Sequence, residues 1–294
     1  AQNLATQKTY LGKLDWNISG DHRLSVTYRQ VQGVNPVFQF FGGTNTSFSN
    51  FWYDARRKTD SYTAQFFSNW SPDFRTEASF TTTKYDGTAK NHGPPFPQVF
   101  IQGLTVARNA DGAIFQNGTV DLGTYNVQQQ NVLQTKTRNG TFSGEYSLGN
   151  HTLVAGIDYQ RTEIADEFIN NAYGSYTFPT LASWLAGTGA SKTQTVLAPG
   201  KTAQDAFGDF TLTTLGVYVA DIWKPTSRLS LSAGLRFDAP YIPQGPTSIP
   251  TAPTYSESAF RSAFGIDSTT TNDGNATFSP RVGFNYKLTS DRQT

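Results

Sequence analysis

The chain has 294 residues, a formal net charge of +1 and no cysteine. The absence of cysteine excludes disulfide bridges and thiolate metal sites. The small net charge does not show the excess of basic residues that is typical of nucleic-acid-binding proteins. Aromatic residues make up 14% of the chain, yet its mean hydropathy is negative. No apolar run of about 18 residues or more occurs, which excludes a transmembrane helix. Such a composition is typical of membrane β-barrels, and it also occurs in secreted all-β proteins.

Strand periodicity opens the chain and recurs along it. Residues 10–18 alternate apolar with polar side chains, residues 19–22 predict a tight turn, and the alternation resumes at 24–29. Further strands are predicted at 57–70 and 74–86, at 135–148 and 152–164, at 215–223 and 229–238, and at 279–288. The chain therefore predicts about nine strands, each long enough to cross a membrane.

The connections between these strands alternate between short and long. Short turns are expected at 19–22, 71–73, 149–151 and 224–228, whereas the intervening loops run from about 33 to 55, 90 to 130, 165 to 206 and 239 to 277. Within one loop, residues 178–187 predict a short helix, with Pro179 near its start and Gly187 after its end. The order predicts an all-β fold, an antiparallel up-and-down transmembrane β-barrel with short periplasmic turns and long extracellular loops.

The hairpin at 215–238 shows the two faces most clearly. Leu229, Leu231, Leu235 and Phe237 share one face, and Arg236 and Asp238 share the other. A barrel strand requires this pattern when its outer face contacts hydrocarbon and its inner face contacts water. We therefore expect Arg236 and Asp238 to form a network on the lumen wall. Nine strands are an odd number, so the chain is interpreted as part of a larger barrel.

Four segments resemble TonB-dependent outer-membrane receptors, in particular their Oar-like branch. They are LGVYVADIWKPTSRLSLSAGLRFD at 215–238, YLGKLDWNISGDHRLSVTYR at 10–29, YTFPTLASWLAG at 176–187 and TFSPRVGFNYKLTSD at 277–291. The resemblance implies a barrel of about 22 strands. It also implies an N-terminal plug in the lumen and import of a bulky nutrient, energised through an inner-membrane complex.

No segment of this chain resembles the family's plug, its energy-coupling box or its last strand with an aromatic carboxy terminus. We therefore expect residues 1–294 to be one partial receptor barrel domain in the bacterial outer membrane. Its expected partners are outer-membrane lipid, the inner-membrane energy-coupling complex through a plug outside this chain, and a small-molecule, glycan or peptide substrate. No nucleic-acid partner is expected.

Substrate recognition is expected in the long loops, because binding residues concentrate on loops carried by a rigid scaffold. Rings with a polar rim suit siderophores, sugars and peptides, but rings beside strand ends can equally form the outer aromatic girdle. The candidate substrate-binding residues are Phe40, Phe41, Trp52, Tyr53, Tyr176, Phe178 and Trp184.

The chain contains few residue patterns that are typical of enzyme active sites. The three histidines have no metal-ligand spacing, and neither a nucleophile elbow nor a phosphate-binding glycine loop occurs. We therefore predict no enzyme, no metal site and no cofactor. Two other functions stay open: a structural or adhesive outer-membrane barrel without transport, and a soluble secreted carbohydrate-binding β protein.

Overall fold

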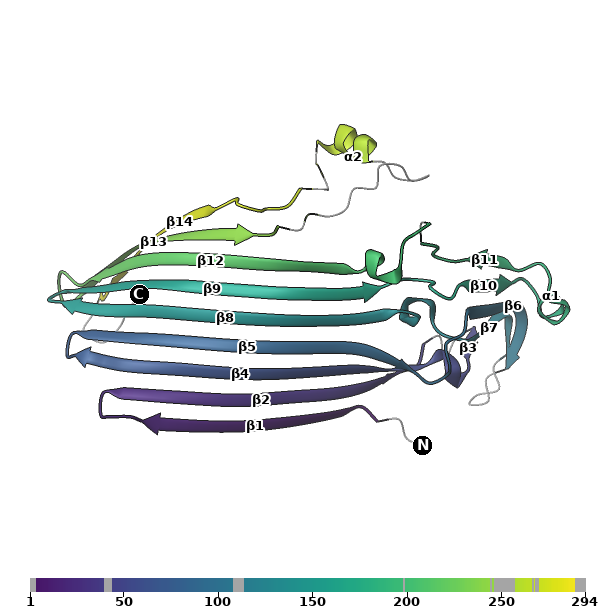
Figure 1. Cartoon of the computed structure of the whole chain (residues 1–294), viewed down its shortest axis with the longest axis horizontal. Coiled ribbons are helices and arrows are strands. Elements are labelled where there is room, and N and C mark those ends of the chain that lie inside the picture. Colours follow the sequence, from purple (N-terminus) through teal and green to yellow (C-terminus); the bar gives the residue numbers. More distant parts are fainter. Residues whose placement is uncertain are drawn as a thin grey trace.

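The computed structural model describes residues 4–39, 44–107, 114–197, 199–243, 245, 257–265, 267 and 270–288. Two sheets make up this part of the chain, one of nine strands and one of five. We call the larger the wall and the smaller the loop sheet, and the loop sheet lies at one end of the wall (Figure 1). The prediction of an all-β fold is confirmed.

The wall is an antiparallel meander in which every strand pairs with the strands that precede and follow it in the wall. Its strands are β1 (Thr6–Asn17), β2 (His22–Val37), β4 (Tyr53–Ser71), β5 (Phe74–Asn91), β8 (Asn131–Leu148), β9 (His151–Phe168), β12 (Gly208–Trp223), β13 (Leu229–Tyr241) and β14 (Thr277–Tyr286). All nine predicted strands are present. The sheet is not closed, because β1 and β14 occupy its two edges.

The strands extend further toward the loop sheet than the sequence pattern predicts. β4 begins at Tyr53, ahead of the predicted 57, and β12 begins at Gly208, ahead of the predicted 215. Alternation marks a strand only where one face meets hydrocarbon and the other meets water. Beyond that zone the backbone pairing continues without an apolar outward face. In the extension of β12, for example, the apolar residues Phe210 and Leu212 lie on the inward face instead.

The long connections are not simple loops. Three of them contribute the strands of the loop sheet, which pair in the order β11-β10-β6-β7-β3. These strands are β3 (Asn45–Ser47), β6 (Gln98–Ala107), β7 (Ile114–Leu122), β10 (Ser175–Phe178) and β11 (Ser191–Thr193). β10 and β6 pair in parallel, as do β3 and β7. The sequence predicted long loops here, because pairing between separate loops leaves no local pattern.

Two short α-helices and three 3-10 turns complete the described chain. α1 (Leu181–Ala186) confirms the predicted helix: a capping box at Thr180 and Ser183 starts it, and Gly187 ends it at φ 65°. The other elements are α2 (Glu257–Phe264), η1 (Ser49–Phe51), η2 (Asn126–Gln128) and η3 (Ala203–Ala206). Among the described residues, no helix is long and apolar enough to span a membrane.

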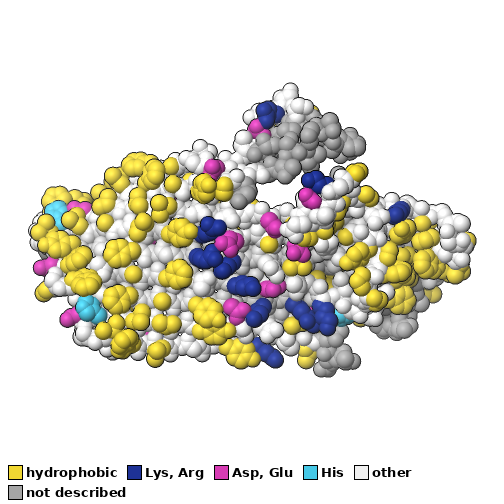
Figure 2. All heavy atoms as spheres, in the orientation of Figure 1, with side chains coloured by type: hydrophobic (Ala, Val, Ile, Leu, Met, Phe, Trp, Pro, Cys, Tyr) yellow, Lys and Arg dark blue, Asp and Glu magenta, His cyan; other side chains and the backbone are white. Residues whose placement is uncertain are grey.

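The outward face of the wall is a band of exposed apolar side chains, visible in yellow toward the left of Figure 2. In its middle, Ile157, Val217 and Phe237 lie opposite one another across three strands and are 40%, 43% and 45% exposed. Aromatic rings edge the band: Trp16, Trp70 and Trp223 at the turn end, and Tyr62, Tyr159 and Tyr241 at the loop-sheet end. Apolar bands with aromatic girdles on both sides are the surface that a bilayer covers.

A charged residue interrupts the apolar outward face of the hairpin formed by β12 and β13. Asp221 lies on the outward face opposite Leu153, close to the turn end of β12. Its Oδ2 is 2.7 Å from Nδ1 of His151, and the His151 ring stacks on Trp223. The carboxylate therefore has a partner at the edge of the apolar band.

Candidate functional site: the lumen wall and the loop sheet

The inward face of the wall is lined by hydroxyl groups. Serine and threonine side chains from neighbouring strands meet at hydrogen-bonding distance, so each hydroxyl has a partner besides water. The pairs are Ser61–Thr83 at 3.1 Å, Thr63–Thr81 at 3.0 Å, Ser79–Thr141 at 2.8 Å and Thr137–Thr162 at 3.2 Å. These pairs give part of the inward face a polar, uncharged surface suited to contact with water or with a polar solute.

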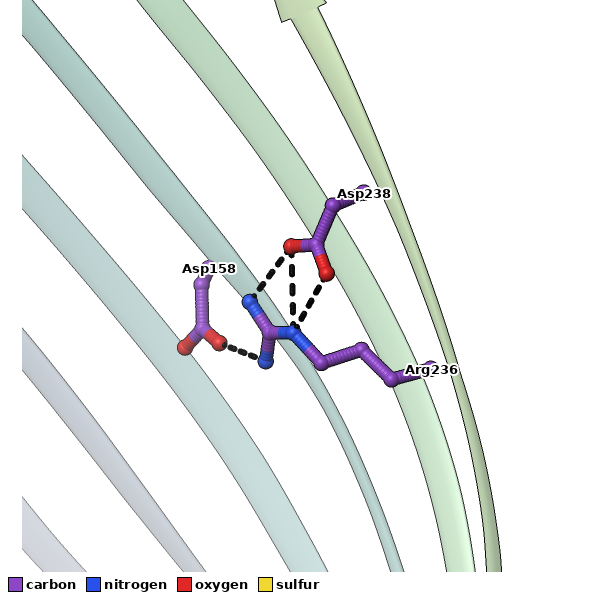
Figure 3. A network of polar contacts seen from close by, with 3 residues as sticks. All are labelled: Asp158, Arg236 and Asp238. Carbon is purple, nitrogen blue, oxygen red and sulfur yellow. Dashed lines mark hydrogen bonds and ion pairs between the residues drawn. The ribbon is translucent and has the colours of Figure 1, made fainter. Parts of the chain in front are cut away.

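Arg236 and Asp238 form the network that the sequence predicted, and a third residue joins them. The Arg236 Nη2 atom lies 2.7 Å from Asp238 Oδ1, and its Nε lies 2.9 Å from Asp238 Oδ2 (Figure 3). Asp158, from β9, accepts a hydrogen bond of 2.5 Å from Nη1. One guanidinium therefore links β9 to β13 across β12 and compensates two carboxylates.

Glycines on β9 and β12 make room for this network. The register places Gly216 beside Asp158 and Asp238, and a Cβ atom on it would collide with the Arg236 guanidinium. Likewise, a Cβ on Gly156 would collide with the Tyr218 ring, over which Arg236 lies at 5.7 Å. No local sequence pattern marks Asp158 as a member of the network, because its contact depends on the pairing register between separate strands.

The first group of candidate aromatic residues lies where β4 meets the loop sheet. Trp52 donates its Nε1 hydrogen to Ser47 Oγ at 2.7 Å and meets the edge of the Phe38 ring at 5.0 Å. Tyr53 is 9% exposed. Phe40 and Phe41 lie outside the described residues.

The second group lies inside the loop sheet. Phe178 is 8% exposed and packs with Val99, and the Trp184 ring meets it edge-on at 5.0 Å. Tyr176 packs against the same cluster, and the Lys192 ammonium lies 5.7 Å above its ring. The structure brings these three aromatic side chains together.

β6 separates the two aromatic groups. Val99 and Ile101 contact Phe178 on one face of this strand, whereas Phe100 contacts Phe51, next to Trp52, with ring centres 6.2 Å apart. Alternate residues of a strand point to opposite faces, so the groups cannot line a single cleft. Both groups pack within the loop sheet, and their role in substrate binding stays a prediction.

Buried side-chain amides hold the loops together, and no local sequence pattern marks them. Gln129 donates to the Thr124 and Gly174 carbonyl oxygens at 3.2 and 2.9 Å, and its Oε1 accepts from the Tyr173 amide at 2.6 Å. Gln98 Oε1 similarly accepts from the Asn126 amide at 2.6 Å. Loops that are rich in polar residues therefore adopt one fixed arrangement.

Asp121 is the one described carboxylate that is fully buried. Its Oδ2 is 3.5 Å from Asn45 Nδ2, and no hydrogen bond to Oδ1 is found. Burial raises the pKa of Asp121 to about 7, since desolvation disfavours the charged form. The loop sheet thus contains a group that titrates near neutral pH.

A hollow of about 240 Å³ lies where the wall meets the loop sheet. Its lining includes Tyr53, Arg57, Tyr85 and Leu133, which share the inward face of β4, β5 and β8. Two larger hollows, of about 710 and 600 Å³, lie at the opposite rim around the hairpin turns. Among the described residues, no three histidine or carboxylate side chains converge on a metal position.

A sequence model of the outer membrane beta barrel domain matches residues 1–294. The chain belongs to this family. The bacterial outer membrane is therefore its location, and hydrocarbon is the medium against the apolar band. No match was found among curated protein sequences.

Solved transporters share this barrel fold. The outer membrane transporter YddB from Escherichia coli superposes with a TM-score of 0.54 at 14% identity, covering 96% of this chain and 29% of that one. The FrpB iron transporter from Neisseria meningitidis gives 0.52 at 14% identity, with 97% and 35% covered. The copper transporter OprC gives 0.51 at 13% identity, also with 97% and 35% covered. The barrel segment described here thus spans about a third of each transporter.

Proposed function

We propose that this chain is part of the barrel of a TonB-dependent outer-membrane receptor, of the Oar-like branch and of about 22 strands, that imports a bulky nutrient. The observation that carries the proposal is the division of the wall into an apolar outward face and an inward face of paired hydroxyls. A polar inner wall serves a solute or a plug inside the barrel.

The similarity to transporters of iron and copper supports the same role, although identities of 13–14% extend only to the fold. The proposed substrate is a siderophore, an oligosaccharide or a peptide. It would enter at the loop-sheet end and meet the inward hollow near Tyr85 and Arg57. Energy would come from an inner-membrane complex acting on a plug.

Uptake by intact cells tests this proposal. Deleting the gene should abolish growth on one scarce ferric siderophore, oligosaccharide or peptide, and blocking the inner-membrane energy-coupling complex should have the same effect. Tyr85→Ala, in the inward hollow, should lower uptake several-fold, whereas Tyr62→Ala on the outward face should leave it unchanged. Deletion cells that lose surface attachment but take up every nutrient tested would instead identify an adhesive barrel.

A further inference from the structure

The inward hollow at the loop-sheet end contains an unpaired cation. Arg57 lies on the inward face of β4 and is exposed, and it forms no ion pair with any described residue. Its neighbours in register on β2 and β5 are glycines. The carboxylates nearest to it in sequence and register, those of Asp54, Asp60 and Asp86, lie on the outward face instead. The chain therefore leaves the Arg57 guanidinium free for a ligand in the lumen.

An unpaired carboxylate lies in the same row of the sheet. The register runs from Arg57 through Gly87 on β5 and Leu133 on β8 to Asp166 on β9. Asp166 is half-buried, and its side chain has no hydrogen bond or ion pair within the described chain. Gly208, its neighbour in register on β12, carries no charge. The cations on this part of β8 and β9 point outward: Lys136, Arg138 and Arg161.

Apolar side chains lie between and beside these two charges. We call them the apolar strip, and its members are Tyr85, Leu133, Ile164 and Phe210. A Cβ atom on Gly87 would lie only 2.9 Å from Cε1 of Tyr85, so the Tyr85 ring folds back along the wall. The strip thus forms a low surface bordered by a cation at one end and an anion at the other.

This arrangement has the dimensions and the charges of a short peptide with free ends. Neighbouring strands lie about 4.7–4.9 Å apart, so three strand spacings place Arg57 and Asp166 about 14 Å apart at the backbone. An extended peptide spans about 3.3–3.6 Å per residue, so about three or four residues cover this distance. Arg57 would bind the terminal carboxylate through two parallel hydrogen bonds, and Asp166 would bind the terminal ammonium group.

We propose that the row from Arg57 to Asp166 binds a zwitterionic peptide of about three or four residues, whose apolar side chains contact the apolar strip. This inference rests on the proposed function, and among the substrates proposed there it selects the peptide. An uncharged oligosaccharide would cover both ions without pairing either of them. A siderophore with only negative groups would place like charge against Asp166.

Calorimetric titration of the full-length protein in detergent with trileucine tests the proposal. Arg57→Gln should weaken the binding of trileucine about tenfold, since a charged hydrogen bond contributes this much, and should leave the binding of C-amidated trileucine unchanged. Asp166→Asn should weaken the binding of trileucine to a similar extent and should leave the binding of N-acetylated trileucine unchanged. Unchanged binding of the blocked peptides also shows that each variant is folded.

Arg29→Gln is the matched control. Arg29 is another exposed arginine of the inward face without an ion pair among the described residues, and it lies opposite Ser61, four residues along β4 from Arg57. This variant should bind trileucine as the wild type does. Equal affinity of the wild type for free and doubly blocked trileucine, or no binding of trileucine at millimolar concentration, would overturn the proposal. Equal losses of free and blocked peptides in the two site variants would overturn it as well.

Binding to the purified protein and uptake by cells separate this inference from the proposed function. If the cells import a siderophore or an oligosaccharide and the protein does not bind trileucine, the peptide assignment is wrong and the receptor role stands. If the protein binds trileucine while deletion cells retain every uptake, the peptide site stands and the transport role is wrong.

Discussion

At the scale of single residues, the lumen wall depends on where side chains are missing as much as on where they are present. Arg236 reaches both carboxylates because Gly216 leaves space beneath its guanidinium. The planar fork satisfies Asp238 through two nitrogens and Asp158 through a third. Without the space beside Gly216, a single charged side chain in the wall could not link residues of three strands.

Replacing Arg236 with glutamine should destabilise the folded barrel by about 1–2 kcal/mol, since a partly exposed charged hydrogen bond contributes this much. Asp158 and Asp238 would then repel each other. Urea unfolding in lipid vesicles measures the change. Arg281→Gln is the matched control, because Arg281 lies on the same face of the adjacent strand with no ion pair among the described residues. Equal losses in the two variants would contradict a special role for the network.

Asp121 should make the loop sheet less stable as the pH rises. Its pKa is about 7 in the folded chain against an ordinary value of 3.8, so the folded state holds a proton that the opened state releases. The free energy of opening should therefore fall by up to about 1.4 kcal/mol per pH unit between about pH 4 and pH 7, and level off above.

Hydrogen exchange of the Phe48 amide reports this opening, because that amide donates to the Asp121 carbonyl oxygen at 3.0 Å. After correction for intrinsic exchange, protection should be higher at pH 5 than at pH 8. Asp121→Asn should remove the dependence. If this variant retained the full pH dependence, a titrating group other than Asp121 would be responsible for it.

At the scale of elements, each wall strand meets two solvents. In β12, Val217 points outward and Thr214 points inward, three residues apart. The same substitution should therefore have opposite consequences on the two faces, because hydrocarbon excludes charge and the lumen side does not.

An arginine at Val217, near the middle of the apolar band, should cost about 2–4 kcal/mol of folding free energy in lipid. Thr214→Arg, of the same size and charge, should cost well under half as much because the guanidinium remains hydrated. Folding yield and urea unfolding in vesicles compare the two. If both variants lost the same stability, the assignment of faces would be wrong.

At the scale of the whole molecule, the loop sheet should face the cell exterior and the turns the periplasm. The chain has no cysteine, so single cysteines can be introduced without background. Ser191→Cys, exposed in β11, should react with a membrane-impermeant maleimide on intact cells. Ser227→Cys, in an exposed turn, should react only after the outer membrane is opened. The reverse pattern would invert the proposed orientation.

The sequence alone determined the nine wall strands, their order and which face of each meets lipid, because these depend on a period of two and on turn residues close in the chain. It also located α1, whose cap residues lie beside it. Tertiary structure decided the rest. The loop sheet joins strands from three separate connections, and Asp158 reaches Arg236 across 78 residues through a register between separate strands. None of these contacts is local, so no pattern in the sequence marks them.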